Sequence, residues 1–196
     1  MKPIKLKIKK PAKVAPGKSK LGGAPDLPKG VAYPVNEDDE DMPFLCQINL
    51  SEFKNEIAPK GMLYFFCQLD DTTEWGQVIF AKDDKSLQAK SPKNINNEYM
   101  DIEYPLPEHP ITFETMKGAD RDDDDYFEIM GVSRIGGDIL ASEADTSDMD
   151  EISLLQINTE EVEVLEENVE EFLHFLIDKS DLAKKKFDKV LVTSQH

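Results

Sequence analysis

Histidine and cysteine side chains are the natural candidates for acid–base or nucleophilic chemistry, and this chain has few of them. Its three histidines, His109, His174 and His196, are scattered along the sequence without the spacing of a catalytic or metal-binding set. Its two cysteines, Cys46 and Cys67, lie inside apolar runs, where a thiol packs as a small hydrophobic side chain. The sequence therefore predicts no catalytic residue, no metal site and no cofactor, and both thiols are expected to be buried and unreactive.

Two glutamines have more unusual surroundings. Gln47 and Gln156 each stand in the middle of a short apolar segment, and a buried amide must find hydrogen-bond partners. One interpretation is that each glutamine braces neighbouring loops. The alternative is that they line, together with His174, a cleft in which a small ligand or a substrate binds.

Acidic side chains are concentrated in two short runs. The runs are Glu37, Asp38, Asp39, Glu40 and Asp41, and Asp122, Asp123, Asp124 and Asp125. The second run begins like a calcium-binding loop, but Asp125 stands where that loop needs glycine, and Gly131 stands where it needs glutamate. We expect both runs to be solvated loops that present negative charge to a binding partner.

The elements that carry these residues show an internal likeness. Residues 45–49 (LCQIN) are similar to residues 154–158 (LLQIN), and a double glycine precedes each copy. A second apolar run follows each copy, at residues 62–67 and 172–177. Matched features in the same order predict an internal two-fold repeat. The cleft considered for Gln47, Gln156 and His174 would lie between the two repeats.

The same segments predict the fold class. Short apolar runs bounded by proline, glycine and acidic residues are typical of buried strands, and residues 75–81, 99–104 and 111–116 have the same character. Helix signals are fewer, with Ser51, Thr159 and Ser180 as expected N-caps. The sequence therefore predicts an α+β protein that is mainly antiparallel β, with an internal two-fold repeat and a few short helices.

We expect one compact domain with three parts. Residues 1–18 form a basic strand and loop, residues 19–118 hold the first repeat and its connecting strands, and residues 119–196 hold the second repeat. Apolar and lysine side chains alternate over residues 4–9, which is the period of a strand. Lysines protect exposed sheet edges, so this segment is predicted to be an edge strand. A flexible basic arm is the alternative.

The charge is unevenly distributed and restricts the classes of partner. The chain has a net charge of −17, yet its first thirty residues contain nine lysines and one acid, which leaves −25 on the remainder. A body of that charge repels phosphate backbones, so nucleic acid is not an expected partner. Apolar runs are far shorter than the ~20 residues of a membrane span, and no secretory signal is recognised. We expect a monomeric, cytoplasmic protein without a membrane partner.

Three segments of the first half, residues 19–28, 43–50 and 60–66, resemble the YwqG-like family of bacterial proteins. The second half resembles that family in the order of its motifs, so the resemblance covers roughly residues 19–192. It implies a β-rich, internally duplicated fold without a settled enzymatic activity. Residues 138–140 depart from the family pattern, because Asp-Ile-Leu stands where members usually carry tyrosine and proline.

Charge and resemblance together predict a non-catalytic binding protein. We expect its acidic surface to capture a basic protein partner, as an immunity protein or antitoxin captures a cationic toxin; such a role is proposed for members of the family. The alternative is a small-ligand binder or an enzyme that uses the cleft between the repeats.

Overall fold

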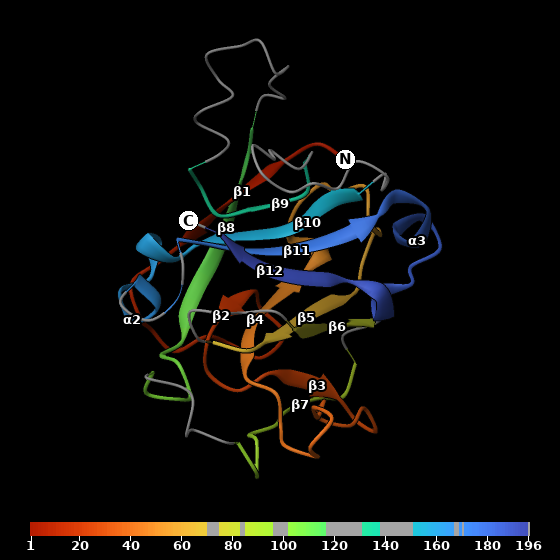
Figure 1. The fold of residues 1–196 in the computed structure, drawn as a ribbon. Helices are drawn as coiled ribbons and strands as arrows, with labels where there is room; N and C mark the ends of the chain where they lie inside the picture. Colours follow the sequence, from red (N-terminus) through yellow and green to blue (C-terminus); the bar gives the residue numbers. More distant parts are fainter. Residues whose placement is uncertain are drawn as a thin grey trace.

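The structure, a computed structural model, is mostly antiparallel β (Figure 1). It describes residues 1–69, 75–82, 85–95, 102–116, 131–137, 151–166, 169 and 171–195. The strands are β1 (Ile4–Ile8), β2 (Lys20–Leu21), β3 (Asp26–Pro28), β4 (Phe44–Asn49), β5 (Met62–Cys67), β6 (Gly76–Ala81), β7 (Leu87–Ala89), β8 (His109–Thr115), β9 (Arg134–Ile135), β10 (Glu151–Asn158), β11 (Phe172–Asp178) and β12 (Leu191–Gln195). The described helical turns are α2 (Glu163–Glu166), α3 (Lys179–Ala183), η1 (Leu50–Glu52), η2 (Thr159–Glu161) and η3 (Phe187–Lys189).

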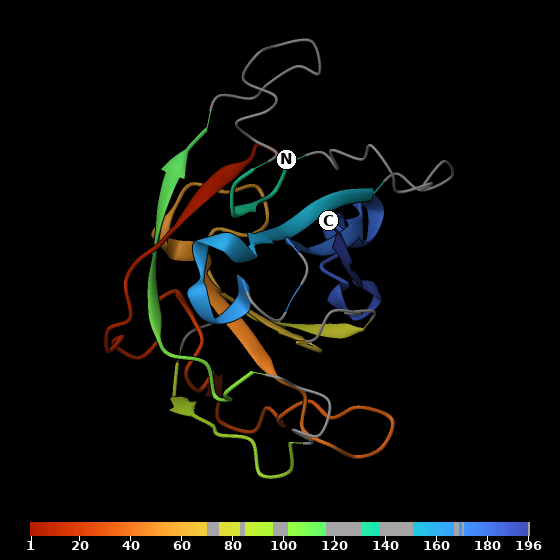
Figure 2. The ribbon, with the colours of Figure 1, turned by 60° about the vertical axis from the view of Figure 1, so that its left-hand side comes forward.

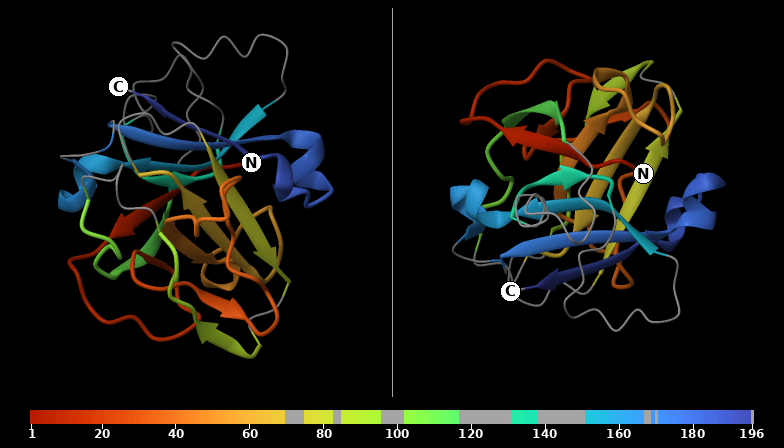
Figure 3. Two further views of the ribbon diagram at one scale, coloured as in Figure 1. Left: turned by 60° about the horizontal axis from the view of Figure 1, so that its bottom comes forward. Right: turned by 90° about the horizontal axis from the view of Figure 1, so that it is seen from above.

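Ten strands form one sheet in the order β12-β11-β10-β9-β1-β8-β2-β4-β5-β6. The sheet curls almost into a closed cylinder, so that its two end strands, β6 and β12, approach each other (Figure 3). At this seam a Cβ atom on Gly76 would lie only 2.7 Å from Val192 Cγ2. Helix η3 covers the adjoining part of β6, where the rings of Phe80 and Phe187 lie 5.4 Å apart.

The interior of the cylinder is a packed apolar core. Phe65 of β5 and Phe175 of β11 meet edge to face across it, with ring centroids 5.1 Å apart. Strand β5 is buried on both faces, because its alternate side chains Met62, Tyr64 and Phe66 pack into a second apolar cluster outside the cylinder. The small sheet of β3 and β7 lies on that side of the molecule (Figure 2).

The α+β prediction is wrong, because strands dominate and the two described α-helices contain only four and five residues. Helices this short have no stability of their own, since nucleation costs more than a single turn returns. The strands of the two predicted repeats belong to one sheet. Hydrogen-bonded pairing continues without a break from β10 through β9, β1, β8 and β2 to β4, so the strands make one sheet.

Residues 4–8 form the predicted strand, but its place at a sheet edge was wrong. Strand β1 pairs with β8 along its whole length and with β9 at Ile4 and Lys5. Ile4 and Leu6 point into the core, while Lys7 and Lys9 are exposed. The lysines therefore mark the outer face of an interior strand, and alternation alone did not distinguish the two cases.

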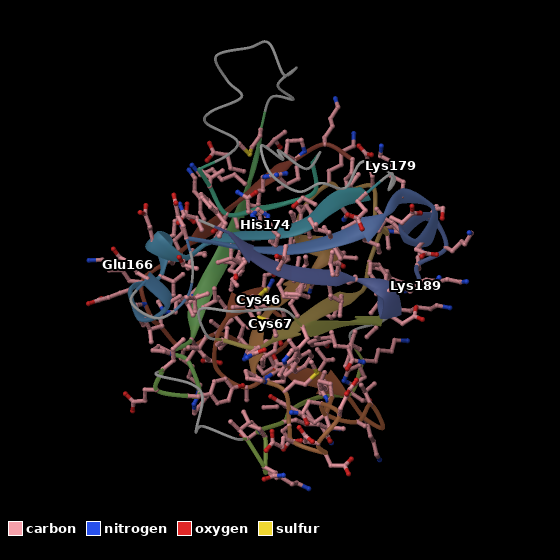
Figure 4. The ribbon with its side chains drawn as sticks, in the orientation of Figure 1. Cys46, Cys67, Glu166, His174, Lys179 and Lys189 are labelled. Carbon is pink, nitrogen blue, oxygen red and sulfur yellow. The ribbon has the colours of Figure 1, made fainter. Side chains whose placement is uncertain are left out.

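Both cysteines lie in the core, as predicted, and neither is in a disulfide. Figure 4 shows them close together on β4 and β5. Burial, with a smaller contribution from Cys67, raises the pKa of the Cys46 thiol well above its usual value, which disfavours the reactive thiolate. None of the described helices has the length and apolar character needed to cross a membrane.

Candidate functional site

Gln47 is a fully buried residue of β4 whose amide is saturated with hydrogen bonds. Its Oε1 accepts the backbone N–H of Asp26 at 2.8 Å. Its Nε2 donates to the carbonyl of Lys18 and to Asp26 Oδ2, both at 2.8 Å. These contacts fasten the loop between Lys18 and Asp26 to the sheet, and they leave no polar atom of the side chain facing a cavity. The geometry favours the bracing interpretation.

Gln156 on β10 makes the corresponding contacts. Its Nε2 donates to the carbonyl of Val132 at 3.0 Å, and its Oε1 accepts from Arg134 Nη2 at 3.0 Å. Two asparagines act similarly, because Asn49 Nδ2 donates to the Gly17 carbonyl and Asn158 Nδ2 to the Gly131 carbonyl. The likeness between the two sequence segments thus corresponds to shared local bracing.

His174 lies opposite Gln156 in the pairing of β10 with β11 (Figure 4). Its Nε2 is buried without a hydrogen-bond partner. Burial and, secondly, the Arg134 charge lower the pKa of His174 to about 4. Gln47 is not brought to this pair, because four strands separate β4 from β10 in the sheet order and Phe65 and Phe175 fill the interior.

The first acidic run forms an ordered loop held by Asn36. Asn36 Oδ1 accepts the N–H groups of Asp38 at 3.0 Å and Glu40 at 2.9 Å. Asp41 Oδ2 accepts the N–H of Asn94 at 2.8 Å and that of Lys93, so Asp41 ties the loop to a distant segment. The side chains exposed to solvent are Glu37, Asp38 and Asp39, while Glu40 and Asp41 are half-buried. The second acidic run, Asp122 to Asp125, lies outside the described residues.

A groove of about 910 Å³ runs from this acidic loop to the seam of the sheet. Three segments line it, and they are far apart in the sequence: the acidic loop with its flanks, the residues around the start of β6, and helix η3 with its C-terminal neighbour. The lining residues are Val35, Asn36, Glu37, Asp38, Glu40 and Met42, then Gln68, Trp75, Gly76 and Gln77, and finally Phe187, Asp188 and Val190.

Charge in the groove has one sign. Among the described residues, its lining contains four carboxylates, Glu37, Asp38, Glu40 and Asp188, and no lysine, arginine or histidine. In the described part of the chain, none of the four carboxylates is in an ion pair. Low-dielectric walls focus the field of like charges in a groove, so the groove attracts cations.

Trp75 and Val35 give the groove an exposed apolar side, with 37% and 47% of their surface accessible. Tryptophan binds cations over its ring face and is enriched in the binding centres of protein interfaces. Prediction from sequence missed Trp75, Phe187 and Asp188. A signal existed only for Trp75, which is the single tryptophan of the chain and directly follows an acid, Glu74.

Among the described residues, the polar side chains that line the groove are carboxylates and amides. Within the described ranges, no group of three or more histidine, cysteine and acidic side chains is placed to hold a metal ion. Its charge and its exposed aromatic ring are suited to binding a cationic surface.

Fold and groove define a mostly antiparallel β protein with an acidic groove at the seam of its sheet. The chain belongs to a family described as "Domain of unknown function (DUF1963)", whose model matches residues 19–195. The match begins after the basic strand β1 and the loop that follows it. No curated protein matches the chain.

Proposed function

We propose that this chain is a YwqG-like member of its family and a non-catalytic protein that binds a lysine- or arginine-rich segment of a partner protein. The acidic groove between the Asn36 loop and η3 is the binding site. The observation that carries the proposal is the set of four carboxylates beside an exposed tryptophan, without a cationic side chain among the described lining residues. Antagonism of a cationic toxin is one role that such a protein would fill.

The carboxylates and Trp75 are expected to contribute differently to binding, because their typical free energies differ. An exposed ion pair contributes only about 0–1 kcal/mol, because water and salt screen it. Its main effect is to steer a basic partner and to accelerate association. Trp75 supplies the anchor, since truncation of a central tryptophan in an interface costs about 2 kcal/mol or more. The carboxylates therefore accelerate association, and Trp75 slows dissociation.

Trp75 also supplies the readout, because it is the only tryptophan in the chain. The probe is an all-lysine octapeptide, titrated at low salt while the fluorescence of Trp75 is recorded. We expect saturable binding by the wild type. We expect the groove variant Glu37→Gln/Asp38→Asn/Glu40→Gln/Asp188→Asn to bind roughly tenfold or more weakly, since four ion pairs are lost at about 0–1 kcal/mol each.

A matched control removes the same amount of charge elsewhere. Glu160, Glu161, Glu163 and Glu166 are exposed around η2 and α2. Figure 4 places Glu166 on the opposite side of the molecule from Lys189, the neighbour of Asp188. Changing these four glutamates to glutamine is expected to have little effect. Equal loss in both variants, or no saturable binding by the wild type, would refute the proposed site.

The cleft alternative has less support. The amides of Gln47 and Gln156 are engaged in loop bracing, and aromatic rings occupy the interior between their strands. The described contacts of both amides are with the protein itself, which favours the groove over the cleft.

A further inference from the structure

A second hollow, whose described lining contains three lysines and the Asp188 carboxylate, adjoins the acidic groove. It has a volume of about 410 Å³ and is lined by Val78, Phe80, Lys82, Lys184, Lys185, Phe187 and Asp188. Phe187 and Asp188 line both hollows, so helix η3 is their common wall. We call this second hollow the basic pocket. Acidic groove and basic pocket are neighbouring parts of one surface.

The three lysines of the basic pocket are exposed, and none of them is in an ion pair among the described residues. Lys185 lies with its Nζ 5.8 Å from the centroid of the Phe80 ring, which holds the side chain over the pocket. Phe80 in turn packs on Phe187 at 5.4 Å. The pocket therefore lets an anionic group form ion pairs with three lysines beside an aromatic, apolar surface.

Strand β6 runs from the acidic groove to the basic pocket. Gly76 and Gln77, at its start, line the acidic groove, whereas Val78, Phe80 and Lys82 line the basic pocket. Alternate residues of a strand share a face, so the last three line one side. From Gln77 to Lys82 the backbone advances about 17 Å at ~3.3 Å per residue. An extended peptide of five or so residues covers the same distance.

From this arrangement we propose that the partner's docking segment is bipolar. This inference rests on the proposed function. The docking segment places lysine or arginine side chains in the acidic groove and, about five extended residues away, a glutamate or aspartate in the basic pocket. Two charges of opposite sign at a fixed spacing select one orientation of the segment and exclude the reverse one. The basic pocket is therefore the specificity element, and the acidic groove provides the attraction.

The test uses three octapeptides and the fluorescence of Trp75. The first is Lys-Lys-Lys-Gly-Ser-Gly-Glu-Glu, the second has the reverse order, and the third replaces both glutamates of the first with glutamine. Attraction by net charge alone predicts that the third binds tightest, because the protein is strongly negative and the third peptide is the most positive. A bipolar site predicts the opposite. One of the two glutamate peptides then binds about fivefold tighter than the third, which is the scale of one or two surface ion pairs.

Variants test whether the tighter binding of a glutamate peptide depends on the basic pocket. We expect Lys82→Gln/Lys184→Gln/Lys185→Gln to abolish it while leaving the affinity for the all-lysine octapeptide undiminished. The control Lys10→Gln/Lys54→Gln/Lys60→Gln removes the same charge from exposed positions outside both hollows and is expected to keep the advantage.

The outcomes separate the two proposals. If neither glutamate peptide binds tighter than the glutamine peptide, or if the advantage survives in the pocket variant, the bipolar site is refuted while the acidic groove stands. If the all-lysine octapeptide does not bind, the groove and the bipolar site are refuted together.

Discussion

At the scale of single residues, Gln47 distinguishes bracing from ligand binding. Gln47→Leu keeps the volume but leaves the Asp26 N–H and the Lys18 carbonyl without their partners. A buried polar group left unsatisfied costs about 1–3 kcal/mol, so we expect the free energy of unfolding to fall by about 3 kcal/mol. Urea unfolding measures it, and Gln88→Leu, at an exposed position of β7, is the control. An unchanged unfolding free energy would contradict the bracing role.

His174 gives the fold a dependence on pH. The pKa of His174 is about 4 in the folded protein against an ordinary value of 6.5, so the unfolded chain binds the extra proton more readily. Stability is complete above about pH 6.5 and falls as the pH drops towards 4, by about 3 kcal/mol in total. We expect His174→Phe to lose less stability than the wild type between pH 7 and pH 4, measured by urea unfolding. Equal losses of unfolding free energy in the two proteins would show that His174 does not cause the dependence on pH.

At the scale of elements, Asp41 determines the position of the acidic loop. Its carboxylate accepts N–H groups of Lys93 and Asn94, and hydrogen bonds to a charged acceptor contribute about 1.5–3 kcal/mol. Asp41→Ala is expected to accelerate hydrogen exchange of those two amides by roughly tenfold or more. Asp38→Ala is the matched control, because no described hydrogen bond uses the Asp38 carboxylate. Equal exchange in both variants would mean that the loop holds its position without Asp41.

The sequence predicted the individual strands better than their arrangement. Apolar runs at residues 62–67 and 172–177 are strands β5 and β11 as expected, because burial of both faces leaves a strong local pattern. Helix starts were misplaced by one or two residues. The side chains that cap η1, η2 and α3 are Asn49, Asn158 and Asp178, which sit at the ends of strands. Pairing partners of β1 are not encoded in its own residues, so its interior position could not be read from it.

At the scale of the whole molecule, the groove could not be predicted from the sequence either, because it forms between segments that are far apart in the chain. Its acidic loop was recognised as charged, but Trp75 and Asp188 reach it only because the sheet curls until β6 approaches η3 and β12. Closure of this kind depends on strand order and twist rather than on a local motif. Composition therefore indicated an excess of negative charge, and the fold showed where a part of it lines a groove.

Curling of the sheet also places the lysines that follow β1 away from the groove. Strand β1, followed by exposed Lys9 and Lys10, lies in the middle of the strand order, whereas the groove lies at the seam between the two ends. Lys9 and Lys10 are thus on the far side of the cylinder from the groove. A cationic partner is attracted on one side and repelled on the other, which orients it during approach.

Association kinetics test this orientation. The screening length shrinks from ~30 Å at 0.01 M salt to ~8 Å at 0.15 M, so the rate at which the all-lysine octapeptide binds should fall steeply over that range. Stopped-flow fluorescence of Trp75 measures the rate.

At low salt we expect Lys9→Gln/Lys10→Gln to raise the association rate by less than about twofold and to leave dissociation unchanged, because these lysines act only through the long-range field. Glu37→Gln/Asp38→Asn should slow association and hasten dissociation, since those carboxylates also contact the bound peptide. An association rate that is indifferent to salt would show that the negative charge serves solubility alone, and it would leave Trp75 as the principal binding determinant of the groove.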